Sequence, residues 1–437
     1  MKKHTQSPYE SSKVSYKPSG IEWLGEIPQS WKNVSIRSCF TESNQRCNTD
    51  SYPLLSVTIA NGIIYQDDIE NKKDISNDDK SNYKIVPLNA VAYNKMRMWQ
   101  GAVGVNTLTT GIVSPAYIVA IPNEKILPNF VSYLFKSKIM IGEFDKNSYG
   151  LCLDMNNLRY DDFRNIKIPL PPLQEQKEIA EFLDSKCEKI QNYIDKKQKL
   201  ITLLQEKKQA LINEAVTKGL NPNIESKNSG IEYLGLIPHH WEVKKLKYVG
   251  KVVLGKMLYN EHQKGYSHCY YLKSKNLQWL NVEVSQIEKM WFSEYEKSLY
   301  RIKKDDLLVS EGGEVGKTCI WNNELAECYI QNSVHKITLN KFNNAKFFLY
   351  LFFTYGKLGV FDSVVSRVSI AHLVLEKLIN VDMVVPPLQE QKEIAAFLDS
   401  KVAQIDSAIE KTKRQIELVK EYKNTLINEA VCGRIDL

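Results

Sequence analysis

Three segments of the chain bring together side chains that suit contacts with a nucleic acid. The first, Tyr93-Asn-Lys-Met-Arg-Met-Trp-Gln100, combines amides, cations and an indole ring. Arginine and lysine match the hydrogen-bonding edge of guanine, asparagine and glutamine match adenine, and cations and amides also hold phosphates. The candidate base or phosphate contacts in this segment are Asn94, Lys95, Arg97, Trp99 and Gln100.

Similar content occurs further along, in Glu311-Gly-Gly-Glu-Val-Gly-Lys317 and Gln331-Asn-Ser-Val-His-Lys336. The candidates there are Lys317, Gln331, Asn332, His335 and Lys336. Such a string, taken alone, is also typical of a solvated turn. The choice between the two interpretations depends on the elements that carry these segments.

The sequence lacks the motifs of several enzyme classes that act on nucleotides or DNA. Gly312-Gly-Glu-Val-Gly-Lys-Thr318 resembles a P-loop, but its spacing is one residue short. An adenine methyltransferase needs Asn or Asp before Pro-Pro and an aromatic residue, whereas both Pro-Pro pairs here precede Leu. The Pro-Asp of PD-(D/E)xK nucleases, the HExxH of zinc metalloproteases and the cysteine spacings of structural zinc sites do not occur. We predict no catalytic residue and no metal site in this chain.

The composition indicates two or three globular domains. The chain has 437 residues, of which 43% are hydrophobic and 25% charged. Its net charge of +7 permits nucleic-acid binding without requiring it. The N-terminus has no signal-peptide pattern, and the most apolar run, residues 345–353, is too short to span a bilayer. We therefore expect a cytoplasmic protein with no membrane partner.

Two repeated strings show how the chain is organised around the candidate segments. Pro171-Pro-Leu-Gln-Glu-Gln-Lys-Glu-Ile-Ala180 recurs letter for letter at residues 386–395. Earlier, Ser19-Gly-Ile-Glu-Trp-Leu-Gly-Glu-Ile-Pro28 recurs with two changes at residues 229–238. We call each of these two strings an entry motif, because it precedes a variable block. The order of motif, long variable block and helix therefore occurs twice, which indicates a tandem duplication.

Each Pro-Pro pair is expected to open a helix of about 45 residues, roughly 65–70 Å long. Apolar residues recur in both helices at alternating steps of three and four, which predicts a coiled-coil seam. Lys197 and Lys208 interrupt the first seam, and Thr412 and Lys423 interrupt the second at the same places. The seam residues are Leu183, Ile190, Ile194, Ile201, Leu204 and Leu211, with Leu398, Ile405, Ile409, Ile416, Val419 and Leu426 in the second helix.

The predicted fold class is α+β, with two mixed α/β domains separated by two long helices. We expect the helices to pair as an antiparallel coiled coil with pseudo-twofold symmetry; the alternative is that each helix packs on its own domain. The predicted segments are an N-terminal tail (1–18), the first domain (19–170), the central helix (171–219), a linker (220–228), the second domain (229–385) and the C-terminal helix (386–433).

From about residue 19 to residue 433, the duplicated helices and entry motifs around two unlike blocks resemble the specificity subunit of type I restriction–modification systems. The resemblance implies that each block is a target-recognition domain for one half of a split, asymmetric double-stranded DNA site. The helices would set the unread gap between the halves. The subunit itself would be non-catalytic.

The resemblance also implies partners and cofactors. Two modification subunits would dock, partly on the helices, and methylate adenine N6 with S-adenosylmethionine. Two restriction subunits, which are motor–nucleases, would add DNA cleavage with ATP and Mg²⁺. The competing hypothesis is a coiled-coil adaptor that carries two protein-interaction domains and does not bind DNA.

Overall fold

The computed structural model describes residues 15–47, 52–69, 80–150, 156–364, 372–435 and 437. The chain forms two compact units. The first contains residues 1–197 and 414–437, and the second contains residues 198–413. The predicted tail and linker each end in a strand, since residues 16–18 and 226–228 pair with later strands. The unit boundaries fall inside the two long helices, so each unit is a domain together with parts of both helices.

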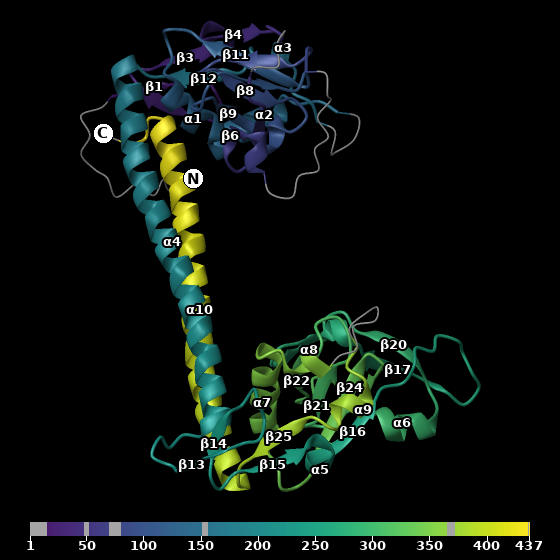
Figure 1. Cartoon of the computed structure of the whole chain (residues 1–437). Helices are drawn as coiled ribbons and strands as arrows, with labels where there is room; N and C mark the ends of the chain where they lie inside the picture. Colours follow the sequence, from purple (N-terminus) through teal and green to yellow (C-terminus); the bar gives the residue numbers. More distant parts are fainter. Residues whose placement is uncertain (1–14, 48–51, 70–79, 151–155, 365–371, 436) are drawn as a thin grey trace, which may run out of the picture. The chain divides into compact units, whose positions relative to one another are not determined.

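The first unit is built around a four-stranded antiparallel sheet in the order β4-β11-β8-β9 (Figure 1). The helices α1 and α2 pack beside it, and α1 supplies four buried side chains to the core. The hairpin β5–β6 lies next to β9. The strands are β1 (Tyr16–Pro18), β2 (Glu26–Pro28), β3 (Lys32–Ser35), β4 (Phe40–Ser43), β5 (Leu55–Thr58), β6 (Gly62–Tyr65), β7 (Lys84–Val86), β8 (Val91–Asn94), β9 (Val103–Val105), β10 (Gly111–Val113), β11 (Tyr117–Pro122) and β12 (Lys167–Leu170). The helices are η1 (Ile36–Ser38), η2 (Gln66–Asp68), η3 (Met98–Gln100), α1 (Pro128–Lys136), α2 (Lys138–Lys146), α3 (Tyr160–Phe163) and the first part of α4 (Leu173–Lys218).

The second unit repeats this plan with a sheet in the order β16-β24-β21-β22. An additional three-stranded sheet, β20-β17-β23, extends it. The strands are β13 (Ser226–Asn228), β14 (Leu236–Pro238), β15 (Glu242–Lys245), β16 (Gly250–Leu254), β17 (Ser267–Leu272), β18 (Leu277–Gln278), β19 (Asn281–Val282), β20 (Glu288–Phe292), β21 (Leu307–Ser310), β22 (Thr318–Ile320), β23 (Tyr329–Ile330), β24 (Val334–Leu339) and β25 (Asp382–Val385). The helices are the last part of α4, α5 (Leu246–Val249), η4 (Ser274–Asn276), α6 (Glu294–Tyr300), α7 (Ala345–Lys357), α8 (Val360–Val364), α9 (Leu375–Leu378) and the first part of α10 (Leu388–Val431), whose end belongs to the first unit.

The two variable blocks share a topology that their sequences do not reveal. In each block the last strand before the long helix, β12 or β25, pairs antiparallel with the strand that follows the entry motif, β3 or β15. In each, a shorter helix, α1 or α7, follows β11 or β24, the second strand in the order of the sheet. The duplication therefore includes the domains themselves.

The long helices α4 and α10 contain 46 and 44 residues. Within the first unit, Leu183 and Ile190 of α4 share a core with Leu426 and Ala430 of α10. Within the second unit, Ile212 and Ala215 of α4 share a core with Ala395 and Leu398 of α10. The start of each helix thus packs with the end of the other, which confirms the antiparallel pairing in both units.

A repeated glutamine anchors each long helix to its domain. Gln176 is fully buried; its side chain donates to the carbonyl of Pro171 and accepts from the backbone N–H of Leu127, at 2.9 and 2.8 Å. Gln391 is also fully buried and makes the equivalent bonds to Pro386 and Asn344, at 2.8 and 2.7 Å. Leu127 and Asn344 are the N-cap residues of α1 and α7. The repeated Pro-Pro-Leu-Gln-Glu-Gln string therefore joins the start of one helix to the start of another.

The entry motifs receive the ends of the long helices. Trp31 is buried and donates from its indole N–H to Glu175 of α4 at 2.6 Å. A Cβ on Gly433, just after α10, would lie 2.5 Å from Pro28, so this glycine packs directly on the first motif. In the second unit, Trp241 packs in the same way beside Gly219, while Glu390 bonds to His240 at 2.7 Å. Each motif holds one helix start and one helix end.

Candidate nucleic-acid interface

The first candidate segment forms the β8–β9 loop, residues 95–102. Asn94 and Trp99 shape this loop from within: the Asn94 side chain accepts from the N–H of Met96 at 3.0 Å, and Trp99 donates to the Met96 carbonyl at 3.1 Å. Arg97 and Gln100 are exposed, while Lys95 is half-buried. The loop therefore exposes the guanidinium of Arg97 and the amide of Gln100 to solvent, while Asn94 and Trp99 hold its backbone in place.

A glycine in left-handed conformation closes this loop. Gly101 has φ +89°, and a Cβ there would lie 2.9 Å from Cδ1 of Ile141 on α2. In the second unit the β21–β22 loop, residues 311–317, contains Gly316, with φ +76° and a Cβ position 2.1 Å from the Phe361 ring on α8. Both glycines stand two residues before the next strand. The two loops are thus structural equivalents, which the sequence comparison missed because only the glycine is shared.

The β21–β22 loop is held by a chain of polar contacts. Lys317 pairs with Glu314 at 3.1 Å, and the Trp279 indole N–H also donates to Glu314. Lys357, the last residue of α7, lies over the Trp279 ring at 5.0 Å. Burial raises the pKa of Glu314, but the hydrogen bonds from Trp279 and Lys317 outweigh it and the pKa is lowered. Glu314, Trp279 and Lys357 were not among the sequence candidates.

This loop joins two antiparallel strands, β21 and β22. A P-loop instead leads from a strand into a helix whose N-terminus faces the phosphates. The resemblance of residues 312–318 to that motif therefore does not extend to its structure.

Gln331 and Asn332 lie in the turn between β23 and β24 and are half-buried. The Gln331 amide donates to the Asn332 side chain, and its oxygen accepts from the N–H of Ser333 at 3.2 Å. The backbone N–H of Asn332 donates to the backbone carbonyl of Lys256 at 2.8 Å. These two residues hold the turn in shape.

His335 and Lys336 correct the sequence prediction, because both lie inside the domain. His335 on β24 is 0% exposed and bonds through Nε2 to the Leu373 carbonyl at 2.6 Å. Lys336 is buried and donates to the carbonyls of Leu299 and Arg301, at 2.9 and 2.7 Å. Burial lowers the pKa of both groups, that of His335 to about 4. Neither side chain is available to a duplex at the surface.

The predicted seam residues of α4 and α10 differ in how deeply they are buried. Leu183, Ile190, Ile201, Leu398, Ile409, Ile416 and Leu426 are buried, and Ile194, Leu204, Leu211, Ile405 and Val419 are half-buried. Lys208, which interrupts the seam, donates to both oxygens of Asp406 at 2.7 and 2.9 Å. The interruption is therefore a cross-helix ion pair.

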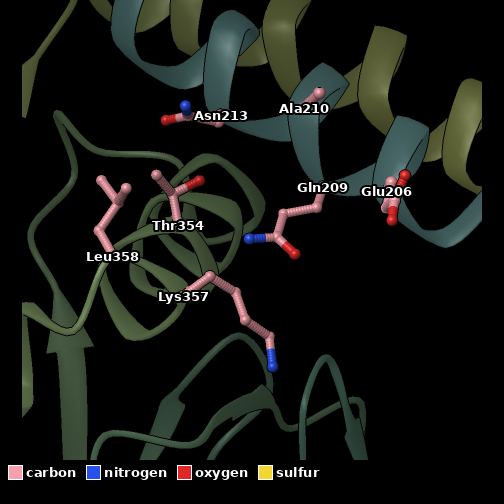
Figure 2. Close-up of a pocket in the computed structure, with 7 residues that line it drawn as sticks. All are labelled: Glu206, Gln209, Ala210, Asn213, Thr354, Lys357 and Leu358. Carbon is pink, nitrogen blue, oxygen red and sulfur yellow. The ribbon is translucent and has the colours of Figure 1, made fainter.

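A pocket of about 300 Å³ lies between α4 and the end of α7 in the second unit (Figure 2). Polar side chains line it from both helices, including Glu206, Gln209 and Asn213 of α4 and Thr354 of α7. In Figure 2 the side chain of Lys357 runs away from α4, with its amine distant from the labelled α4 side chains. Among the described residues, no group of three or more His, Cys, Asp or Glu side chains could hold a metal ion.

Comparison with known families shows which family the chain belongs to. Residues 32–203 and 238–418 match the model of the type I restriction modification DNA specificity domain. The chain belongs to this family. Over 443 aligned residues it is 25% identical to the putative type I restriction enzyme MjaX specificity subunit of Methanocaldococcus jannaschii, with 94% of this chain and 95% of that protein covered. The MjaVIII specificity subunit of the same organism is 28% identical over 74% of each chain.

Solved structures of the type I family share the fold. A chain from a study of complex assembly and conformational transition of the type I R-M system superposes with a TM-score of 0.69 at 17% identity, covering 94% of this chain and 99% of that one. The HsdS subunit of Thermoanaerobacter tengcongensis superposes with a TM-score of 0.55 at 18% identity, covering 94% and 98%. In the described part of this chain, no helix combines the length and apolar character needed to cross a membrane.

Proposed function

We propose that this specificity subunit reads a bipartite, asymmetric site on double-stranded DNA, one half with each domain. The main support for the proposal is that the β8–β9 and β21–β22 loops occupy equivalent positions in the two domains. Each joins the third and fourth strands of its own domain's sheet, and each has a left-handed glycine, Gly101 or Gly316, two residues before the next strand. Their other side chains differ, so one fold presents two different contact surfaces.

The chemistry of the loops supports base reading. Arg97 and Gln100 are the exposed candidates of the first loop, and these residue types pair with guanine and adenine edges. The second loop presents the Glu314–Lys317 pair, and a carboxylate can accept from cytosine N4. Because the two loops offer different donors and acceptors, the half-sites are expected to differ.

The paired helices are proposed to set the gap between the half-sites. At 1.5 Å per residue, a helix of this length extends about 65–70 Å. One DNA turn is about 34–36 Å. A spacer longer than one turn allows two readers to contact the same face of a duplex about one turn apart.

Two modification subunits are proposed to dock partly on the outer faces of the helices. Leu203 of α4 and Leu418 of α10 occupy corresponding positions in the repeat and are 51% and 47% exposed. Exposed apolar side chains on a helix face are typical of interaction surfaces. S-adenosylmethionine would bind to the modification subunits, and ATP with Mg²⁺ to the restriction subunits. The specificity subunit would contribute no catalytic group.

Salt-dependent binding distinguishes this function from the adaptor alternative. The full chain with its modification subunits is titrated with duplex DNA at several salt concentrations. Contacts with phosphates predict that log K falls linearly with log salt, with a slope of about −0.9 for each phosphate neutralised. A complex that assembles but shows no salt-dependent DNA binding would favour the adaptor.

A further inference from the structure

The turn of the β5–β6 hairpin and the β8–β9 loop form one surface in the first unit, which we name the loop platform (residues 58–62 and 95–101). Gly104 on β9 has no room for a side chain, since a Cβ there would lie 2.7 Å from the backbone nitrogen of Ile63. The platform exposes Ile59, which is 48% accessible, together with Arg97 and Gln100. These residues come from two segments that are far apart in the sequence.

A single lysine ties the two segments together. The Lys136 ammonium group, on the last residue of α1, donates to the carbonyls of Ile59, Gly101 and Thr58 at 2.6, 3.1 and 3.3 Å. An ammonium has three N–H donors, so these bonds use all of them. All three acceptors are backbone carbonyls. Burial lowers the pKa of Lys136 to about 8, as expected for a cation held only by carbonyl dipoles.

The second domain has a lysine at the corresponding end of α7. Lys357 lies on the ring of Trp279, whose indole N–H donates to Glu314 in the β21–β22 loop. Trp279 packs closely on Gly356, where a Cβ would lie 2.0 Å from the ring. Figure 2 shows the Lys357 side chain directed away from α4. Lys357 therefore supports its loop through Trp279, whereas Lys136 holds its loop directly.

We propose that Lys136 and Lys357 are positioning residues for DNA reading, each fixing the loop of its own domain without contacting DNA through its ammonium group. This inference rests on the proposed function. It assigns to the final lysine of α1 and α7 a role in half-site discrimination. A platform that is no longer fixed still carries its exposed side chains, but it presents them in several arrangements, so fewer of them match the base edges at once.

The test uses the full chain with its modification subunits, carrying Lys136→Met or Lys357→Met. Methionine keeps the apolar stem and removes the N–H donors and the charge. Binding is measured on the intact recognition site, on a duplex with the first half-site scrambled and on one with the second scrambled, across a salt series. Lys125→Met, at an exposed lysine before α1, is the matched control, and thermal unfolding checks that each variant is folded.

Lys136→Met is expected to reduce discrimination at the first half-site about tenfold, comparable with one mismatched base pair, and to leave the second unchanged. Lys357→Met should do the reverse. The slope of log K against log salt should stay at the wild-type value in both variants. Lys357 is exposed, so its variant tests the role even if Lys136→Met does not fold.

Unchanged discrimination in a folded variant would overturn the inference for that domain. A slope smaller by about 0.9, with affinity lost equally on all duplexes, would instead make the lysine a phosphate contact. If the wild-type complex itself discriminates neither half-site, the proposed function fails and the positioning role fails with it.

Discussion

At the scale of single residues, burial rather than residue type decides what a side chain can do. His335 is enclosed on β24, and desolvation lowers its pKa from 6.5 to about 4, although the bond to Leu373 opposes the shift. Between these values the unfolded chain binds a proton that the folded chain does not. The free energy of unfolding contributed by this site is therefore constant at neutral pH and is lost as the pH falls from 6.5 towards 4.

Chemical denaturation of the wild type and of His335→Gln tests this linkage. Between about pH 7 and pH 5, the wild type should lose more stability than the variant, because glutamine does not titrate. Equal losses in the two proteins would show that His335 is already protonated, or is accessible, in the folded state.

Arg97 is the exposed cation of the β8–β9 loop, so its loss should affect one half-site only. Arg97→Ala is expected to cost about 1–3 kcal/mol of binding free energy and to relax specificity at one position of the first half-site. Arg37→Ala, an exposed arginine on η1, is the control. Competition binding against single-base variants of the site measures both effects; relaxation in the second half-site would contradict the assignment of the loops.

Residue type in the sequence indicates which side chains could contact DNA, but it does not show which of them reach the surface of the folded domain. It identified the segment that exposes Arg97 and Gln100, because amides, cations and an indole ring gather there within eight residues. It could not show that His335 and Lys336 belong to an interior strand, since the string Gln331-Asn-Ser-Val-His-Lys336 changes from turn to strand within a few residues. Lys136 was not identified, because its partners are backbone carbonyls and carbonyls leave no pattern in a sequence.

At the scale of elements, the repeated strings predicted the long helices and their pairing, but they did not predict the shared sheet. Helix pairing depends on side-chain periodicity, which survives in both copies. The sheet order depends on backbone pairing, which tolerates different side chains as long as the buried positions remain apolar. Only the glycines that precede β9 and β22 carried a signal, because their left-handed conformation limits the residue type.

Gln176 and Gln391 connect elements, so their removal should destabilise the units around them. Gln391→Ala leaves the buried N–H of Asn344 and the carbonyl of Pro386 without their partner. Such losses cost about 1–3 kcal/mol for each buried group. Gln389→Ala, at an exposed glutamine two residues earlier in α10, should cost less than about 0.5 kcal/mol, as surface substitutions do. Urea unfolding measures both; equal effects would contradict the anchoring role.

The ion pair between Lys208 and Asp406 is expected to favour one register of the helix pair. Lys208→Glu should destabilise the second unit by placing two carboxylates together, and adding Asp406→Lys should restore a pair. A double-mutant cycle should give a coupling energy of about 0.5–1 kcal/mol, since both groups are partly exposed. Additive effects would mean that the pair contributes nothing to register.

At the scale of the whole molecule, the helices are proposed to determine the length of the unread gap. Four residues inserted after Ile201 add about one helical turn, or roughly 6 Å. With DNA rising about 3.4 Å per base pair, the gap should lengthen by one or two base pairs while both half-sites stay the same. An unaltered gap, established by the methylation pattern of the variant complex, would exclude the spacer role.

The central claim is that two domains of one chain read two different DNA half-sites. The most direct measurement is to express this chain with its modification subunit in a methylation-free host and to map N6-methyladenine at single-base resolution. Two different readers on one spacer should give a split, asymmetric motif with one modified adenine in each half and a fixed gap between them. A continuous or palindromic motif, or no new methylation from a soluble complex, would contradict this claim.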